Sequence, residues 1–178
     1  MTSSKKVPSD LKPLSHPVEV ATIKPDGLVV AFDADESERA GLAKLFDIPA
    51  VVTLSASFKL LRKGTRVKVR GHVSGIVTRL CVLSLEAFDM DFHEDVSVDF
   101  DEVVETPRDE DDDKEQVTDG PDPIIDGVID LGVLAAEFTA LSLDPYPKKP
   151  GVVFDYHEEG DDKPPSPFSA LAGIKSKA

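Results

Sequence analysis

The stretch that decides the fold is Val51–Val73, VVTLSASFKLLRKGTRVKVRGHV, in which two alternating runs flank a Lys63-Gly64 turn. In the first run, apolar residues occupy every second position and share one strand face: Val52, Leu54, Ala56, Phe58 and Leu60. The second run has its own apolar face, made by Val67, Val69, Gly71, Val73 and Val77. Two such runs joined by a short turn predict neighbouring antiparallel strands, each with an apolar and a polar face.

The strand pattern extends over residues 50–100. A further strand is predicted from its alternating apolar residues: Phe88, Met90, Phe92, Val96, Val98 and Phe100. Glu94 interrupts that apolar face and fits only if the strand is bulged or lies at an edge there. Gly71 and Gly75 indicate a bulge or bend. Arg79 falls on the apolar positions, which predicts a register shift between Gly75 and Cys81.

Two helices accompany these strands. Asp35 and Glu38 form an Asp-x-x-Glu capping box, which predicts a helix from Glu36 to about Phe46. Asp130 is a good N-cap for a second helix, which ends at Asp144-Pro145 because proline lacks a backbone N–H. Short strands at 17–23 and 28–32 precede the first helix. The prediction is an α+β fold: a curved antiparallel sheet of about five or six strands with two main helices.

The domain organisation follows from composition along the chain. Its 178 residues suffice for one domain with a real core, so residues 1–178 are expected to form a single domain. We expect a flexible arm at residues 1–15 and a disordered acidic linker at 101–123. An extended tail with a short terminal helix is predicted for residues 152–178.

Several functional classes are disfavoured. The chain has one cysteine, which excludes an internal disulfide and a multi-cysteine zinc site, so we expect no metal and no cofactor. It has no signal peptide and no apolar run of about 18 residues, which predicts a cytoplasmic protein without membrane contact. No catalytic motif is present, so no catalytic residue and no small-molecule substrate are predicted.

Charge is strongly segregated in a chain whose net charge is −14. Residues 48–85 contain no acid, and Arg66, Lys68 and Arg70 alternate there, so these three project from one strand face at about 7 Å spacing. That spacing suits nucleic-acid phosphates. The candidate RNA contacts are Arg62, Lys63, Arg66, Lys68, Arg70 and Arg79. The alternative is a solvated outer sheet face, which any antiparallel sheet needs.

Four short motifs carry a family resemblance. They are Asp130-Leu131-Gly132, Asp144-Pro145-Tyr146-Pro147-Lys148, the terminal Pro167-Phe168-Ser169-Ala170-Leu171-Ala172, and Cys81-Val82-Leu83-Ser84-Leu85-Glu86. The chain resembles the YceD family (domain of unknown function 177), in its alphaproteobacterial form. Members often have a second cysteine where this chain has Ser84. We therefore interpret Cys81 as a small buried hydrophobe on the same face as Leu83 and Leu85. The other motif residues are expected to be structural.

The resemblance implies a non-enzymatic factor in large ribosomal subunit biogenesis that supports accumulation of 23S ribosomal RNA. Transient contact with ribosomal RNA or with a large-subunit ribosomal protein is the expected mode. The acidic segment then prevents indiscriminate RNA binding, engages a basic ribosomal protein, or only solubilises the chain. The alternative is a protein-binding adaptor without RNA contact that uses the helix and arm of residues 130–151. Tyr146 and Pro147 either pack the helix end on the sheet or present a rigid peptide to a partner.

Overall fold

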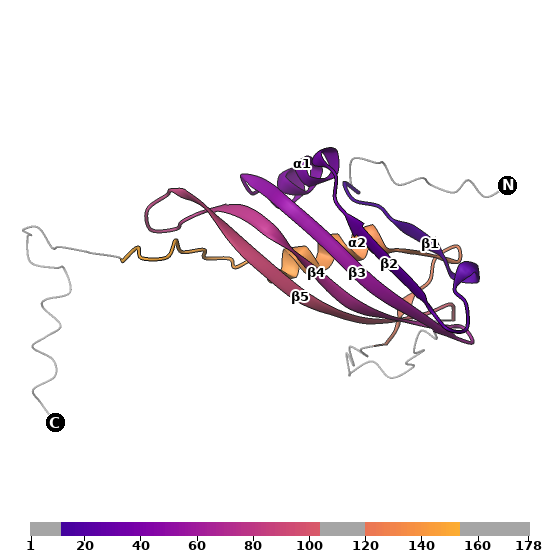
Figure 1. Ribbon diagram of the computed structural model, residues 1–178. Helices are drawn as coiled ribbons and strands as arrows, with labels where there is room; N and C mark the ends of the chain where they lie inside the picture. Colours follow the sequence, from indigo (N-terminus) through magenta and orange to yellow (C-terminus); the bar gives the residue numbers. More distant parts are fainter. Residues whose placement is uncertain (1–11, 104–119, 154–178) are drawn as a thin grey trace, which may run out of the picture.

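Three long antiparallel strands form the centre of the molecule (Figure 1). The computed structural model describes residues 12–103 and 120–153. The strands follow one another in a meander, which short turns at residues 64–65 and 81–86 allow. They are β3 (Ala50–Lys63), β4 (Arg66–Leu80) and β5 (Ala87–Asp101).

Two shorter strands complete this sheet, and two more form a small separate one. The order in the main sheet is β2-β3-β4-β5-β6, with β2 (Leu28–Asp33) antiparallel to β3 and β6 (Asp122–Pro123) parallel to β5. β1 (Pro17–Glu19) pairs antiparallel with β7 (Val128–Asp130), and the 3-10 turn η2 (Val20–Thr22) follows β1. The main sheet is open. The predicted α+β class and the curved, mostly antiparallel sheet are therefore confirmed.

Both helices pack on the same apolar face of the sheet. α1 (Glu36–Leu45) lies against β3, and α2 (Leu131–Ser142) lies against β4, β5 and β1. Figure 1 shows α2 behind the long strands, so the viewer faces their polar side. The core combines side chains from both helices with the inward-facing strand residues, including Leu42, Phe58, Leu60, Val69, Val73, Val77, Leu131 and Leu134. No helix of the described residues is long and apolar enough to cross a membrane.

The segment before β1 passes between the two helices. Leu14 is only 1% exposed, and a Cβ on Gly41 of α1 would lie 2.5 Å from Pro13 Cβ. A flexible arm was predicted for residues 1–15, but its last residues are packed. Leu14 belongs to the hydrophobic core, so the packed domain begins before residue 15. Residues 1–11 lie outside the described part of the chain.

The strand register corrects two predictions about individual residues. β4 and β5 pair without interruption from Arg66↔Asp101 to Leu80↔Ala87, so the register shift predicted near Arg79 is absent. The irregularity lies instead in β3, between Val51 and Thr53. This bulge turns Val51 into the core and leaves Val52 exposed, although the alternation predicted Val52 on the apolar face.

The ends of the predicted acidic linker belong to strands. Asp101 closes β5 and is buried, and Asp122–Pro123 forms β6. Residues 104–119, which carry most of the linker, lie outside the described residues. So does most of the predicted tail at 152–178, with the motif residues Pro167 and Phe168.

Candidate functional site

The row of alternating cations on β4 lies on the outer face of the sheet, but carboxylates of β5 occupy it. Arg66 Nε lies 2.8 Å from Asp101 Oδ2. Lys68 Nζ and Arg70 Nη2 lie 3.4 and 2.6 Å from the two carboxylate oxygens of Asp99. The register places Arg66 opposite Asp101 and Lys68 opposite Asp99, so the contacts form a cross-strand charge ladder.

Each carboxylate of this ladder is held in its ionised form. Hydrogen bonding from Arg70 is the main reason that the pKa of Asp99 lies below its usual range. For Asp101 the pKa is also lowered, mainly by the hydrogen bond from Arg66. The Arg66 and Lys68 side chains remain 67% and 58% exposed, so these pairs face solvent on the cation side. The ladder therefore carries much less net charge than the β4 sequence suggests.

The other three candidate RNA contacts lie apart from this row. Arg62 donates to the carbonyls of Gly64 and Val20 and pairs with Glu102 at 3.1 Å, which ties β3 to the η2 turn and to the end of β5. Arg79 points to the helical side and donates to the Asp144 carbonyl at 2.9 Å, beyond the end of α2. Lys63 is exposed at the β3–β4 turn. Arg62 and Arg79 thus have structural partners that strand alternation does not reveal.

A hollow of about 450 Å³ opens beside the charge ladder. Arg66, Arg70, Ser97 and Asp99 line it from the sheet, and residues 120–122 line it from the segment before β6. Both signs of charge face this space. Among the described residues, no group of three or more His, Cys, Asp or Glu side chains is arranged to hold a metal ion.

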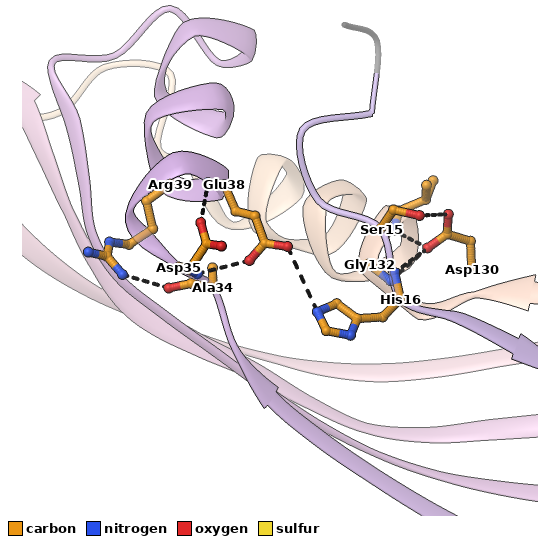
Figure 2. Close-up of polar contacts among 9 residues, drawn as sticks. Ser15, His16, Ala34, Asp35, Glu38, Arg39, Asp130 and Gly132 are labelled. Atoms are coloured by element: carbon orange, nitrogen blue, oxygen red, sulfur yellow. Dashed lines mark hydrogen bonds and ion pairs between the residues drawn. The ribbon is translucent and has the colours of Figure 1, made fainter. Parts of the chain in front are cut away.

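The Asp130-Leu131-Gly132 motif joins the N-terminal segment to α2 (Figure 2). Asp130 Oδ1 accepts hydrogen bonds from the backbone N–H of His16 at 2.8 Å and of Gly132 at 3.1 Å. Its Oδ2 accepts from Ser15 Oγ at 2.8 Å. Gly132 is required because a Cβ there would lie 2.6 Å from the Ser15 backbone. The N-cap predicted from the sequence is present, and it also anchors a distant segment.

The same segment reaches the start of α1. The predicted capping box is complete, since Glu38 N–H donates to Asp35 and Asp35 N–H donates to Glu38, both at 2.8 Å. His16 Nε2 lies 4.0 Å from Glu38 (Figure 2). The His16 ring also stacks on Phe32, with 3.8 Å between the ring centroids. One short segment therefore joins the N-termini of both helices to β2.

The remaining two described motifs meet at the opposite end of the sheet, at the β4–β5 turn. Val82 N–H donates to the Pro147 carbonyl at 2.9 Å, and Lys149 Nζ lies 2.8 Å from Glu86. Together with the Arg79 contact to Asp144, these bonds tie the segment after α2, Pro145-Tyr146-Pro147, to the β4–β5 turn. We call this segment the Pro-Tyr-Pro arm. Pro147 is buried. We define the hairpin-tip surface as four exposed apolar residues at this end of the sheet: Leu80, Val82, Leu85 and Tyr146.

This arrangement separates the roles of the motif residues. Leu85, predicted to lie with Cys81 on a buried face, is 77% exposed because the backbone turns there with a φ of 59°. Tyr146 is 72% exposed, whereas its neighbour Pro147 is buried. Of the two alternatives for this pair, packing describes Pro147, whereas presentation of Tyr146 to a partner stays a prediction. Periodicity alone gave no sign that the two motifs converge.

Cys81 is buried at the base of this turn, as predicted. Its own backbone closes the turn, because Cys81 N–H donates to Glu86 O and Leu85 N–H donates to Cys81 O, both at 2.9 Å. Hydrogen bonds lower the pKa of its thiol from 9.0 to about 6, first from the Ser84 side chain and then from the Lys149 and Ser84 backbones. Ser84, which stands where many family members have a second cysteine, thus acts on the Cys81 sulfur.

These features define an α+β domain with two structural joints built from short motifs. A family model described as large ribosomal RNA subunit accumulation protein YceD matches residues 69–175, more than half of the chain. The chain belongs to the YceD family. Neither a curated protein nor a solved structure matches it.

Proposed function

We propose that this protein is a non-enzymatic factor in large ribosomal subunit biogenesis, which supports accumulation of 23S ribosomal RNA in the cytoplasm. The family match over residues 69–175 carries this proposal, because the description of that family names large-subunit ribosomal RNA accumulation. The matched region includes the hairpin tip and α2 with its arm. The β4–β5 turn and the arm after α2 contact each other at one end of the sheet, and the hairpin-tip surface lies there.

The hairpin-tip surface favours contact with a protein component of the assembling subunit. Leu80, Val82, Leu85 and Tyr146 expose apolar area on a rigid base, since three tertiary contacts fix the turn to the arm. Exposed apolar groups gathered in this way are typical of protein-binding sites. Tyrosine is enriched among residues that dominate binding energy. Lys148 lies exposed beside them at the rim.

Direct RNA contact through β4 is a second candidate, favoured by the exposure of Arg66 and Lys68. A phosphate that approaches these cations meets the Asp99 carboxylate, which already binds Lys68 and Arg70. The phosphate competes with the Asp99 carboxylate for these cations and is repelled by its negative charge. The ladder therefore weakens RNA binding relative to three free cations, and we rank it after the hairpin tip.

Subunit profiles of cells that lack the protein test the proposal. A shortage of free large subunits and of 23S ribosomal RNA is expected, and an unchanged profile would refute the proposed function. Complementation with Leu85→Ser combined with Tyr146→Ala should fail to restore the profile. An Arg66, Lys68 and Arg70 triple alanine variant should restore it. The opposite pattern would favour RNA contact through β4.

A matched control uses Val29, an exposed apolar residue on β2. Val29→Ser removes a similar exposed apolar side chain away from the hairpin tip and should complement fully. Val29→Ser and the double hairpin-tip variant should melt within a few degrees of the parent protein, since exposed substitutions usually change stability by less than about 0.5 kcal/mol. The triple alanine variant leaves the buried Asp101 without Arg66, so its Tm is measured before its complementation is interpreted. Failure of Val29→Ser to complement would show that exposed apolar residues matter in general, and not the hairpin tip.

A further inference from the structure

The outer edge of β5 has no strand partner over most of its length in the described part of the chain. β6 pairs only with Phe100 and Asp101, at the end of the strand. From residue 87 to 99, β4 is the one strand that pairs with β5 among residues 12–103 and 120–153. Figure 1 shows β5 along a border of the sheet. Unpaired strand edges of this length readily accept another strand.

The register shows which backbone groups face outward. Opposite residues of an antiparallel pair alternate between hydrogen-bonded and non-hydrogen-bonded positions. Cys81 N–H donates to Glu86 O, and the register continues from there without a shift, so the odd-numbered residues of β5 turn their N–H and C=O groups away from β4. The Asp101 carbonyl agrees, because it accepts from Ile124 N–H at 2.9 Å on that outer side.

The same odd-numbered residues place a row of acids on the outer face. Asp89, Asp91 and Asp95 lie opposite Thr78, Ile76 and His72 of β4, so no Lys or Arg faces them across the strand pair. Asp95 has a 90% exposed side chain and lies 3.6 Å from His93 Nε2, which stands between Asp91 and Asp95 on this face. This half of β5 differs from Asp99 and Asp101, whose charges the β4 cations balance.

We propose that the free edge of β5 binds a basic, extended polypeptide segment as an added strand. The biological role of this site rests on the proposed function, for which it names the chemistry of the partner. Backbone hydrogen bonds to the outward groups of residues 89–97 supply affinity, as in other cases of strand addition. Residues two apart on both strands repeat at about 7 Å, so alternating Lys or Arg side chains meet Asp89, Asp91 and Asp95.

Charge and shape disfavour the other occupants. A second copy of β5 would bring its own aspartates against this row, and like charges on neighbouring strands repel. Glu94 adds to this protection, because it is a half-buried acid on the inner face, opposite Val73. Inward charged residues of this kind are a known device against edge-to-edge association. RNA would be repelled by the same aspartates. A basic strand is the partner that this edge admits.

Peptide binding to the full chain tests the inference. The probe is a fluorescent Lys-Val repeat of about eight residues, the length of an ordinary strand. We expect saturable binding by fluorescence anisotropy, and none for a Glu-Val repeat. Asp89→Asn, Asp91→Asn and Asp95→Asn together should weaken binding roughly tenfold, through loss of three exposed charge pairs. A Lys-Val repeat with methylated backbone nitrogens on one edge keeps its charge and should not bind.

Asp95→Pro separates strand addition from simple charge attraction. It removes an outward N–H and no bond to β4, and edge strands tolerate proline at such positions. Asp95→Asn is the matched control, because it loses the same charge and keeps the N–H. We expect the proline variant to lose binding and the Asn variant to keep most of it. Equal binding by both variants, or binding of the methylated peptide, would overturn the inference.

Hydrogen exchange of the parent protein tests the added strand without any substitution. Without peptide, the amides of Asp91, His93 and Asp95 should exchange faster than those of Phe92 and Glu94. Saturating peptide should protect the first three. Unchanged exchange rates refute the added strand while leaving the proposed function standing. A normal ribosomal subunit profile in cells without the protein refutes the function, whatever the peptide does.

Discussion

Replacing Asp130 with alanine should lower the free energy of unfolding by about 3 kcal/mol, the sum of three local losses. Loss of the N-cap of α2 costs about 1 kcal/mol. The backbone N–H of His16, which donates to Asp130 Oδ1 at 2.8 Å in a partly buried position, loses its acceptor at about 1–2 kcal/mol. The bonds with Ser15 and Lys12 lie nearer to solvent and add less than about 1 kcal/mol.

Thermal unfolding followed by circular dichroism measures this loss. For a chain of this size, about 3 kcal/mol corresponds to a fall of roughly 6–12 °C in Tm. Asp130→Asn keeps an acceptor oxygen for the three backbone donors, His16, Gly132 and Val133, and should lose less than half as much. If Asp130→Ala melts within about 2 °C of the parent, the joint between the N-terminal segment and α2 does not stabilise the fold as we describe.

The Tm difference between the parent and Asp130→Asn should also depend on pH, because Asp130 titrates and asparagine does not. Burial raises the pKa of Asp130, but the bonds from Ser15, His16 and Val133 and the charge of Lys12 outweigh it, so its pKa lies below the ordinary 3.8. A carboxylate with a lowered folded pKa stabilises the protein fully above the unfolded pKa and loses this effect as the pH falls through the folded pKa. The Tm difference between Asp130→Asn and the parent should therefore narrow below pH 3.8. A Tm difference that stays unchanged below this pH would contradict a stabilising role for the ionised Asp130 carboxylate.

Two further predictions concern the same joint and the hairpin tip. Gly132→Ala should destabilise the protein by about 2 kcal/mol or more in a thermal melt, because its Cβ would lie 2.6 Å from the Ser15 backbone. Ala140→Gly, on an exposed position of α2, is the control at about 1 kcal/mol. The thiolate absorbance of Cys81 should titrate with a midpoint of about 6 and shift upward in Ser84→Ala, whose hydroxyl is the main cause of the lowered pKa. A midpoint near 9.0 in the parent would disprove this role.

Local patterns predicted the elements of the fold well. Strand alternation from residue 51 onward predicted the long strands, because one face of each is buried against the helices. The capping box of Asp35 and Glu38 and the N-cap Asp130 gave both helix starts, because these signals involve residues within one turn. Glu94 was correctly restricted to a bulge or an edge, and β5 is an edge strand at that position within the described residues.

What the sequence could not supply was the pairing between distant segments. The β4 cations were predicted to project from one strand face as candidate RNA contacts, yet the register brings Asp99 and Asp101 opposite Lys68 and Arg66. Alternation within one strand carries no information on its partner. Arg79 was interpreted as a sign of irregularity, but it binds the Asp144 carbonyl, 65 positions away. The bulge near Val52 likewise became visible only from the pairing with β4.

The pairing of β1 with β7 has a consequence for how the chain folds during its synthesis. His16 N–H donates to Asp130 across 114 positions of sequence, and β1 pairs with β7, so the N-terminal strand has no partner until residues 128–130 have emerged. Closing so long a loop comes late and slows folding. Until then the apolar Leu14 side chain stays exposed to solvent. Exposed apolar side chains in a partly folded chain promote aggregation and binding by chaperones. A messenger truncated before α2 would thus yield an aggregation-prone fragment and not a smaller working domain.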